Sequence, residues 1–194
     1  MQSTKSTPYI NEAECWLNLQ QLIQSNPTQR QYIWTYWSGL DSLGHLYGPD
    51  DQRAYLYFKN FTRNLEDNLI NRLSPQQRHK TLIILTSDHG QVTTFKNPHY
   101  EVRNHPDFLD CLHIKPTAES RFTYLHVRPG QEQTLRQLIQ TKWQDQFVLI
   151  RSRDALHAGL FGPGDPMQDT YNRIGDFILL ARDDHYIWWG EEEN

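Results

Sequence analysis

Two short stretches of the chain pair a carboxylate with an imidazole, and both groups bind divalent metal ions in proteins. Asp41 and His45 stand four residues apart in the segment DSLGH. If this segment makes one helical turn, both side chains lie on the same side, because residues i and i+4 share a face of a helix. Asp88 and His89 are adjacent in the segment SDHG, and they can share an ion only if the backbone turns there. Each pair taken alone could equally be a turn with an exposed histidine.

The two pairs taken together predict a centre for two divalent ions. Carboxylate oxygen and imidazole nitrogen suit Zn²⁺ best and Mn²⁺ second. Two such ions about 3.5–4 Å apart can stabilise both the attacking and the leaving oxygen of an in-line displacement at phosphorus. The chemistry that these residue types favour is therefore hydrolysis of a phosphoric ester.

The elements expected to position these pairs are strands and helices in alternation, which indicates the α/β class. Each pair follows a segment predicted to be a buried strand, residues 31–37 (QYIWTYW) and residues 81–85 (TLIIL). In open α/β sheets, ligand sites gather outside the carboxyl ends of the strands, which gives this placement a reason. The glycine- and serine-rich residues 38–48 are predicted to be a loop. The other predicted elements are helices at 12–25, from Pro49 to about 73, at 131–143 and at 152–160, and strands at 121–127, 147–150, 174–181 and 186–189.

Composition limits the class of protein. The chain has 194 residues, of which 37% are apolar, and six Trp, ten Tyr and eight Phe supply material for a core. A formal charge of −4 without a basic cluster excludes a surface that coats nucleic acid. No apolar run approaches the ~18 residues of a membrane span. The N-terminal segment has no hydrophobic signal region, so a cytoplasmic location is expected unless a preceding segment has been lost. Cys15 and Cys111 are predicted to be buried free thiols, with a single disulfide as the alternative.

The segments YWSGLDSLGHLYGPD (36–50) and TLIILTSDHG (81–90) resemble the alkaline phosphatase superfamily, and within it the type I phosphodiesterase/nucleotide pyrophosphatase group. The resemblance continues through residues 116–130, 155–164 and 173–190. It implies that Asp41 and His45 bind one metal ion and that Asp88 and His89 bind the other. It also implies a small phosphoester or nucleotide as the substrate.

The fold that this resemblance implies is an incomplete alkaline-phosphatase-like layered sheet with flanking helices. Residues 1–194 would form a single domain, the C-terminal portion of the catalytic domain. Residues from about 91 to 150 would be a small inserted α+β region that faces the substrate. His99, His105 and His113 lie in this region and are predicted to belong to a solvated loop.

The family also places a nucleophilic Thr or Ser, and a further metal-binding Asp, well upstream of its first metal motif. No residue of this chain aligns with either, so the attacking residue is not assigned here, and a complementing upstream fragment is an implied partner. One alternative is a catalytically inactive fragment or binding module of the same fold. Another is a different member of the superfamily, such as a phosphonate hydrolase or a sulfatase-like enzyme.

Overall fold

The computed structural model describes residues 6–25 and 29–189. The chain divides into two compact units, residues 1–93 and residues 94–194. The unit boundary lies close to the predicted start of the inserted region at about residue 91. The strands of the second unit continue well past residue 150, so the unit is larger than the region predicted from sequence.

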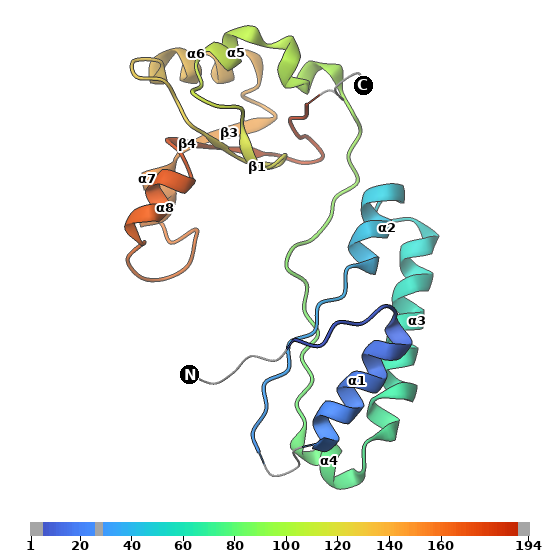
Figure 1. The fold of residues 1–194 in the computed structure, drawn as a ribbon. Helices are drawn as coiled ribbons and strands as arrows, with labels where there is room; N and C mark the ends of the chain where they lie inside the picture. The colour runs from blue at the N-terminus through green and yellow to red at the C-terminus, as the bar shows by residue number, and fades with distance from the viewer. Residues whose placement is uncertain (1–5, 26–28, 190–194) are drawn as a thin grey trace. The chain divides into compact units, whose positions relative to one another are not determined.

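The elements of the first unit are all helical (Figure 1): α1 (Glu12–Ser25), α2 (Gly39–Tyr47), α3 (Gln52–Asn68), the 3₁₀ turn η1 (Ile70–Arg72) and α4 (Pro75–Lys80). Helix α3 begins where the Asp51 side chain accepts a hydrogen bond from the Arg53 backbone N–H, at 2.8 Å. Helix α4 begins with a capping box, in which Ser74 and Gln77 bond to each other's backbone N–H groups. These caps satisfy donors that the first turn of a helix leaves free.

A small aromatic core joins α1 to α3. Trp16, Phe61 and Leu69 are buried there, and Trp37 stacks on Phe61 with ring centroids 3.7 Å apart. The Trp37 indole N–H lies 3.0 Å from both the Glu12 carboxylate and the Tyr57 hydroxyl. Trp37 is therefore a partly buried side chain that packs against this core.

The predicted strands of this unit are wrong. Residues 31–37 and 81–85 are extended but pair with no strand among the described residues. Their apolar side chains are largely exposed, with Leu82 83%, Ile84 76% and Trp34 74% accessible. An apolar run identifies a segment that could be a buried strand, but only a neighbouring strand can hold its backbone groups in a ladder. The glycine-rich segment predicted to be a loop is instead helix α2.

The second unit contains a four-stranded antiparallel sheet with the order β1-β2-β4-β3. Its strands are β1 (Thr117–Glu119), β2 (Phe122–Leu125), β3 (Phe147–Arg151) and β4 (Phe177–Ala181). Its helices are η2 (Pro98–Tyr100), η3 (Val102–Asn104), α5 (Pro106–Asp110), α6 (Glu132–Lys142), α7 (Ser152–His157) and α8 (Gln168–Arg173). Helix α6 and the strands at 121–127, 147–150 and 174–181 were predicted to within a few residues. The strand predicted at 186–189 is wrong, because this segment makes only an isolated bridge from Trp188 to Glu101.

Helices α5 and α6 lie over one face of this sheet, as Figure 1 shows. The core between them contains fully buried side chains from both layers, including Phe108 of α5, Leu135 of α6 and Leu179 of β4. His105 belongs to this core rather than to a solvated loop. It is 8% exposed, its Nε2 lies 2.8 Å from the His99 carbonyl oxygen, and its ring packs edge-on against Trp143. The polar residues around His105 in the sequence had suggested a solvated loop and gave no sign of this burial.

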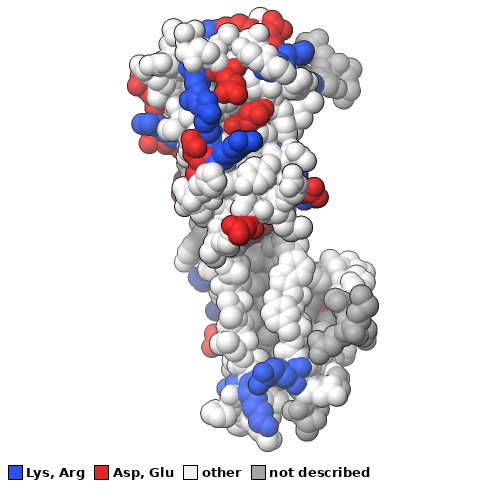
Figure 2. All heavy atoms as spheres, turned by 90° about the vertical axis from the view of Figure 1, so that its left-hand side faces the viewer, with Lys and Arg blue, Asp and Glu red and all other residues white. Residues whose placement is uncertain are grey.

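Both cysteines are buried free thiols, as predicted. Burial raises the pKa of each thiol, which keeps it protonated at neutral pH. In the second unit, Lys and Arg side chains are interspersed with Asp and Glu on the face drawn in Figure 2. Within the described residues, no helix combines the length and the apolar character needed to cross a bilayer.

Candidate metal centre

The four predicted ligands all lie in the first unit, on two elements. Helix α2 carries Asp41 and His45, one turn apart, and the extended segment after residue 85 carries Asp88 and His89. The α2 helix provides the turn that brings the first pair to one face, so the His45 Nε2 lies 3.4 Å from the Asp41 Oδ1. A stretch expected to be a loop thus achieves the i, i+4 geometry as a full helix.

The Asp41 carboxylate is the meeting point of the two elements. Its Oδ1 also lies 3.9 Å from the His89 Nε2, and the same Nε2 lies 3.9 Å from the Asp88 Oδ1. The contacts therefore link His45 to Asp41, Asp41 to His89, and His89 to Asp88. The structure brings all four side chains to one locality, although they were identified as two separate pairs.

The His89 ring is oriented by its own backbone surroundings. Its Nδ1 lies 3.0 Å from the Gly90 carbonyl oxygen, and since a carbonyl can only accept, this nitrogen is the one that carries the proton. The Nε2 is the ring nitrogen that faces Asp41. Histidines that bind metals characteristically donate their other ring N–H to a carbonyl or carboxylate in this way.

Gln91, which the sequence analysis did not identify, is a neutral side chain that contacts Asp41. The Gln91 amide Nε2 donates to the Asp41 Oδ1 at 2.9 Å and to the Asp41 carbonyl oxygen at 3.2 Å. Two residues further on, the Thr93 hydroxyl donates to the Asp50 carboxylate at 2.7 Å. These side-chain bonds attach the extended segment to α2 and to the start of α3. Only the proximity of Gln91 to the SDHG motif could have drawn attention to it.

All four side chains are open to solvent. The exposed fractions are 37% for Asp41, 72% for His45, 70% for Asp88 and 56% for His89. A hydrated ion can therefore reach the oxygen and nitrogen atoms. Across residues 6–25 and 29–189, however, no group of three or more His, Cys, Asp or Glu side chains is arranged to surround one ion. The residue types and the orientation of the His89 ring fit a metal site. The four side chains do not surround one ion, so they would supply only part of a coordination shell.

Comparison with known families gives one result that covers nearly the whole chain. The family described as type I phosphodiesterase / nucleotide pyrophosphatase matches residues 6–194. The chain belongs to this family. Comparison with curated proteins and comparison with solved structures gave no match.

Membership of this family confirms the resemblance inferred from the two motifs and the segments after them. The family is one of phosphodiester and pyrophosphate hydrolases and is generally metal-dependent. The mixed α/β architecture, with several helices and a small open sheet, is consistent with an incomplete alkaline-phosphatase-like fold.

Proposed function

We propose that this chain provides metal-binding residues of a two-metal phosphoester hydrolase of the phosphodiesterase/nucleotide pyrophosphatase type. Asp41 and His45 would bind one divalent ion, and Asp88 and His89 the other. Zinc is the first choice of metal and manganese the second, because the ligands are carboxylate oxygens and imidazole nitrogens. The substrate would be a small phosphoester or a nucleotide.

The observation that carries this proposal is the position of one atom. The Asp41 Oδ1 lies within 3.9 Å of the imidazoles of both His45 and His89, which come from segments far apart in sequence. This closeness would make the ion bound by Asp41 and His45 a neighbour of the ion bound by Asp88 and His89. Bound divalent ions would supply charge stabilisation for the oxygens around phosphorus during the displacement.

The residues of this chain would hold and orient the ligands. Gln91 restrains the Asp41 carboxylate, and the Gly90 carbonyl restrains the His89 ring. Such outer partners set the direction of a ligand's lone pair and its basicity. The attacking hydroxyl is not assigned to this chain. A complementing upstream fragment and a cytoplasmic location belong to the same proposal and stay predictions.

Zinc binding by the full chain tests the ligand assignment without relying on activity. Isothermal titration calorimetry with ZnCl₂ should show saturable binding that Asp41→Asn and His89→Ala each weaken by at least about tenfold, since loss of even an outer partner costs about 10–100-fold. Asp67→Asn and His79→Ala are matched controls, because both side chains are exposed on the same unit and outside the candidate site. Equal weakening by the controls would refute the assignment.

Hydrolysis of bis(p-nitrophenyl) phosphate tests the reaction itself. Asp88→Ala should abolish any zinc-dependent turnover, whether the chain acts alone or with a complementing upstream fragment. Wild-type turnover by this variant would refute the role of Asp88. Zinc binding that depends on the four residues, but with no turnover in either setting, would identify the chain as a binding module of the same fold.

A further inference from the structure

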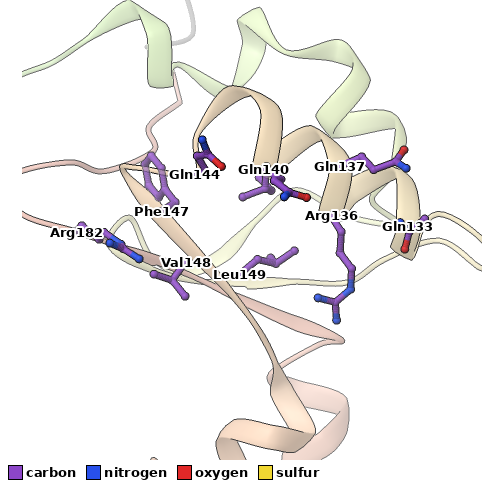
Figure 3. Close-up of a pocket in the computed structure, with 10 residues that line it drawn as sticks. Gln133, Arg136, Gln137, Gln140, Gln144, Phe147, Val148, Leu149 and Arg182 are labelled. Carbon is purple, nitrogen blue, oxygen red and sulfur yellow. The ribbon is translucent and has the colours of Figure 1, made fainter.

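The second unit has a groove whose walls are helix α6 and strand β3. Its volume is about 360 Å³, and Figure 3 shows helix side chains along one wall and Phe147, Val148 and Leu149 of β3 along the other. Strand β3 is an edge strand, because the sheet order β1-β2-β4-β3 gives it a single neighbour, β4. One side of its backbone therefore has no partner strand among the described residues.

The hydrogen-bond pattern decides which backbone groups face that open edge. In an antiparallel pair, alternate residues exchange both of their hydrogen bonds with the partner strand. The Arg182 N–H donates to the Gln146 carbonyl at 2.8 Å, and the Ser152 N–H donates to the Asp176 carbonyl at 3.0 Å. Even-numbered residues from 146 to 152 thus direct their N–H and C=O groups toward β4, and odd-numbered residues direct theirs outward.

Within the part of the chain that the structure describes, four outward backbone groups of β3 have no backbone partner and could pair with a further strand. The Phe147 N–H is already used, since it donates to the Trp143 carbonyl at 2.9 Å. The Arg151 carbonyl stands at the N-cap of α7, where it faces the first turn of that helix. What remains is the Phe147 carbonyl, the N–H and carbonyl of Leu149, and the Arg151 N–H. These are the groups that one extended peptide of about five residues would pair with.

Two arginines, Arg136 and Arg182, line the groove. Arg182 is opposite Gln146, just before β3 begins. The Arg136 guanidinium lies 4.6 Å from the centroid of the Phe177 ring, and Phe177 pairs with the last residue of β3. Neither guanidinium forms an ion pair within the described part of the chain. The groove is also lined by four glutamines, at positions 133, 137 and 140 of α6 and at position 144 in the turn after it, and no lining residue is acidic.

We propose that the groove between β3 and α6 binds an extended peptide that adds a strand to β3 and carries carboxylates recognised by Arg136 and Arg182. Main-chain hydrogen bonds would provide the affinity, as they do in other cases of strand addition to a sheet edge. The guanidinium groups would select for negative charge, because a guanidinium matches a carboxylate with two parallel hydrogen bonds. This site is independent of the phosphoester hydrolase proposal.

The first test uses the wild-type chain and changes only the peptide. The probe is a fluorescein-labelled octapeptide in which Val and Glu alternate, followed by fluorescence polarisation. We expect saturable binding, at least about tenfold weaker binding of the same peptide N-methylated at every residue, and weaker binding of a peptide in which Val and Lys alternate. No saturable binding at millimolar peptide, or equal binding of the N-methylated peptide, overturns the proposal.

The second test changes one backbone donor in the protein. Arg151 has φ −65°, the value that proline requires, and its N–H faces the open edge. Arg151→Pro should therefore keep the fold and weaken the Val/Glu peptide about fivefold, the effect of one hydrogen bond. Arg151→Ala is the matched control, because it removes the same side chain and its ion pair with Glu132 but keeps the N–H.

The outcomes of the second test separate the possible occupants. Equal affinity of the Pro and Ala variants overturns strand addition. If sedimentation shows that the wild-type chain dimerises and that Arg151→Pro makes it a monomer, the occupant is a second copy and the peptide proposal is wrong. If Arg151→Pro does not fold, as shown by exposure of Cys111, the N-methylation result on the wild-type chain alone decides. Arg136→Gln combined with Arg182→Gln should reduce the preference for the Glu peptide over the Lys peptide.

Discussion

Replacing Gly175 with alanine should destabilise the second unit more than the same change at Gly130. Both glycines have positive φ, +64° at Gly175 and +81° at Gly130, so both substitutions place an L side chain in the left-handed region. Their surroundings differ. A Cβ at Gly130 would meet no atom within 4 Å, whereas a Cβ at Gly175 would lie 2.5 Å from the Leu125 carbonyl oxygen.

The loss in the free energy of unfolding has two contributions, the left-handed backbone conformation and the clash of the new Cβ. The left-handed conformation costs an alanine about 1 kcal/mol relative to glycine, and this applies at both positions. At Gly175 the clash is with backbone that cannot easily move, because Leu125 pairs with Phe177 and its carbonyl accepts the Asp176 N–H at 2.9 Å. Overpacking of this kind costs roughly 1–3 kcal/mol more. We expect a loss of about 2–4 kcal/mol for Gly175→Ala and about 1 kcal/mol for Gly130→Ala.

The two cysteines make the measurement specific to each unit. Cys111 is 1% exposed in the second unit and Cys15 is 7% exposed in the first, so neither should react with iodoacetamide in the folded chain. Pulse alkylation across a urea gradient, followed by peptide mass spectrometry, gives a separate unfolding curve for each thiol. A difference of about 2 kcal/mol between the alanine variants should separate their Cys111 midpoints by roughly 1 M urea.

The reasoning fails if the Cys111 curves of Gly175→Ala and Gly130→Ala coincide. That result would mean that the segment around Gly175 relaxes away from Leu125 at negligible cost. The backbone hydrogen bond from Asp176 to Leu125 would then be too weak to hold the two segments in place.

Three further predictions use single side-chain contacts. Gln91→Leu removes the amide that donates to Asp41 and should weaken zinc binding by about tenfold in calorimetry, whereas Gln21→Leu on α1 should not. The hydrogen bond from Lys142 lowers the pKa of Asp107, so the pair stabilises the second unit above about pH 4 and this contribution is lost as the pH falls through the folded-state value. Because both side chains are well exposed, Asp107→Asn should cost only about 0.5 kcal/mol at neutral pH, and the Cys111 midpoints of variant and wild type should converge in acid. Ser74→Ala removes the capping box of α4 and should cost about 1 kcal/mol in the Cys15 curve, whereas Ser42→Ala removes no N-cap and should leave that curve nearly unchanged.

Helices α1, α3, α6 and α7 could be predicted because their signals are local, whereas α2 was predicted to be a loop. Helix α1 was predicted at its observed bounds from apolar spacing alone, and α6 to within one residue at each end. Strands β2, β3 and β4 of the second unit were also located, since each finds its partner within the same unit, whereas β1 was not predicted. The two segments of the first unit, residues 31–37 and 81–85, have equally strong strand composition. They fail as strands because strand formation depends on a neighbour that composition cannot specify.

The candidate site was only partly accessible from sequence. Asp41 and His45 were identified from residue type and spacing, and Asp88 and His89 from their position after an apolar run. One oxygen of Asp41 faces both imidazoles because the extended segment lies beside α2 at this point. No local sequence pattern predicts that placement. Gln91 was missed for a related reason, because an amide that orients a carboxylate has no characteristic spacing from it.

The attachment of the extended segment to α2 links binding at the candidate site to the stability of the first unit. Residues 81–85 pair with no strand among the residues that the structure describes. The segment that follows them is attached by the side-chain bonds from Gln91 to Asp41 and from Thr93 to Asp50. Two neighbouring cations, one on Asp41 and His45 and the other on Asp88 and His89, would add a further connection between the segment and α2. Binding that requires this folded geometry stabilises it, by about 2.7 kcal/mol at a free ion concentration one hundred times the dissociation constant. On the proposed assignment, the residues that would position phosphoester chemistry would therefore also hold the segment around His89 and Gln91 beside α2.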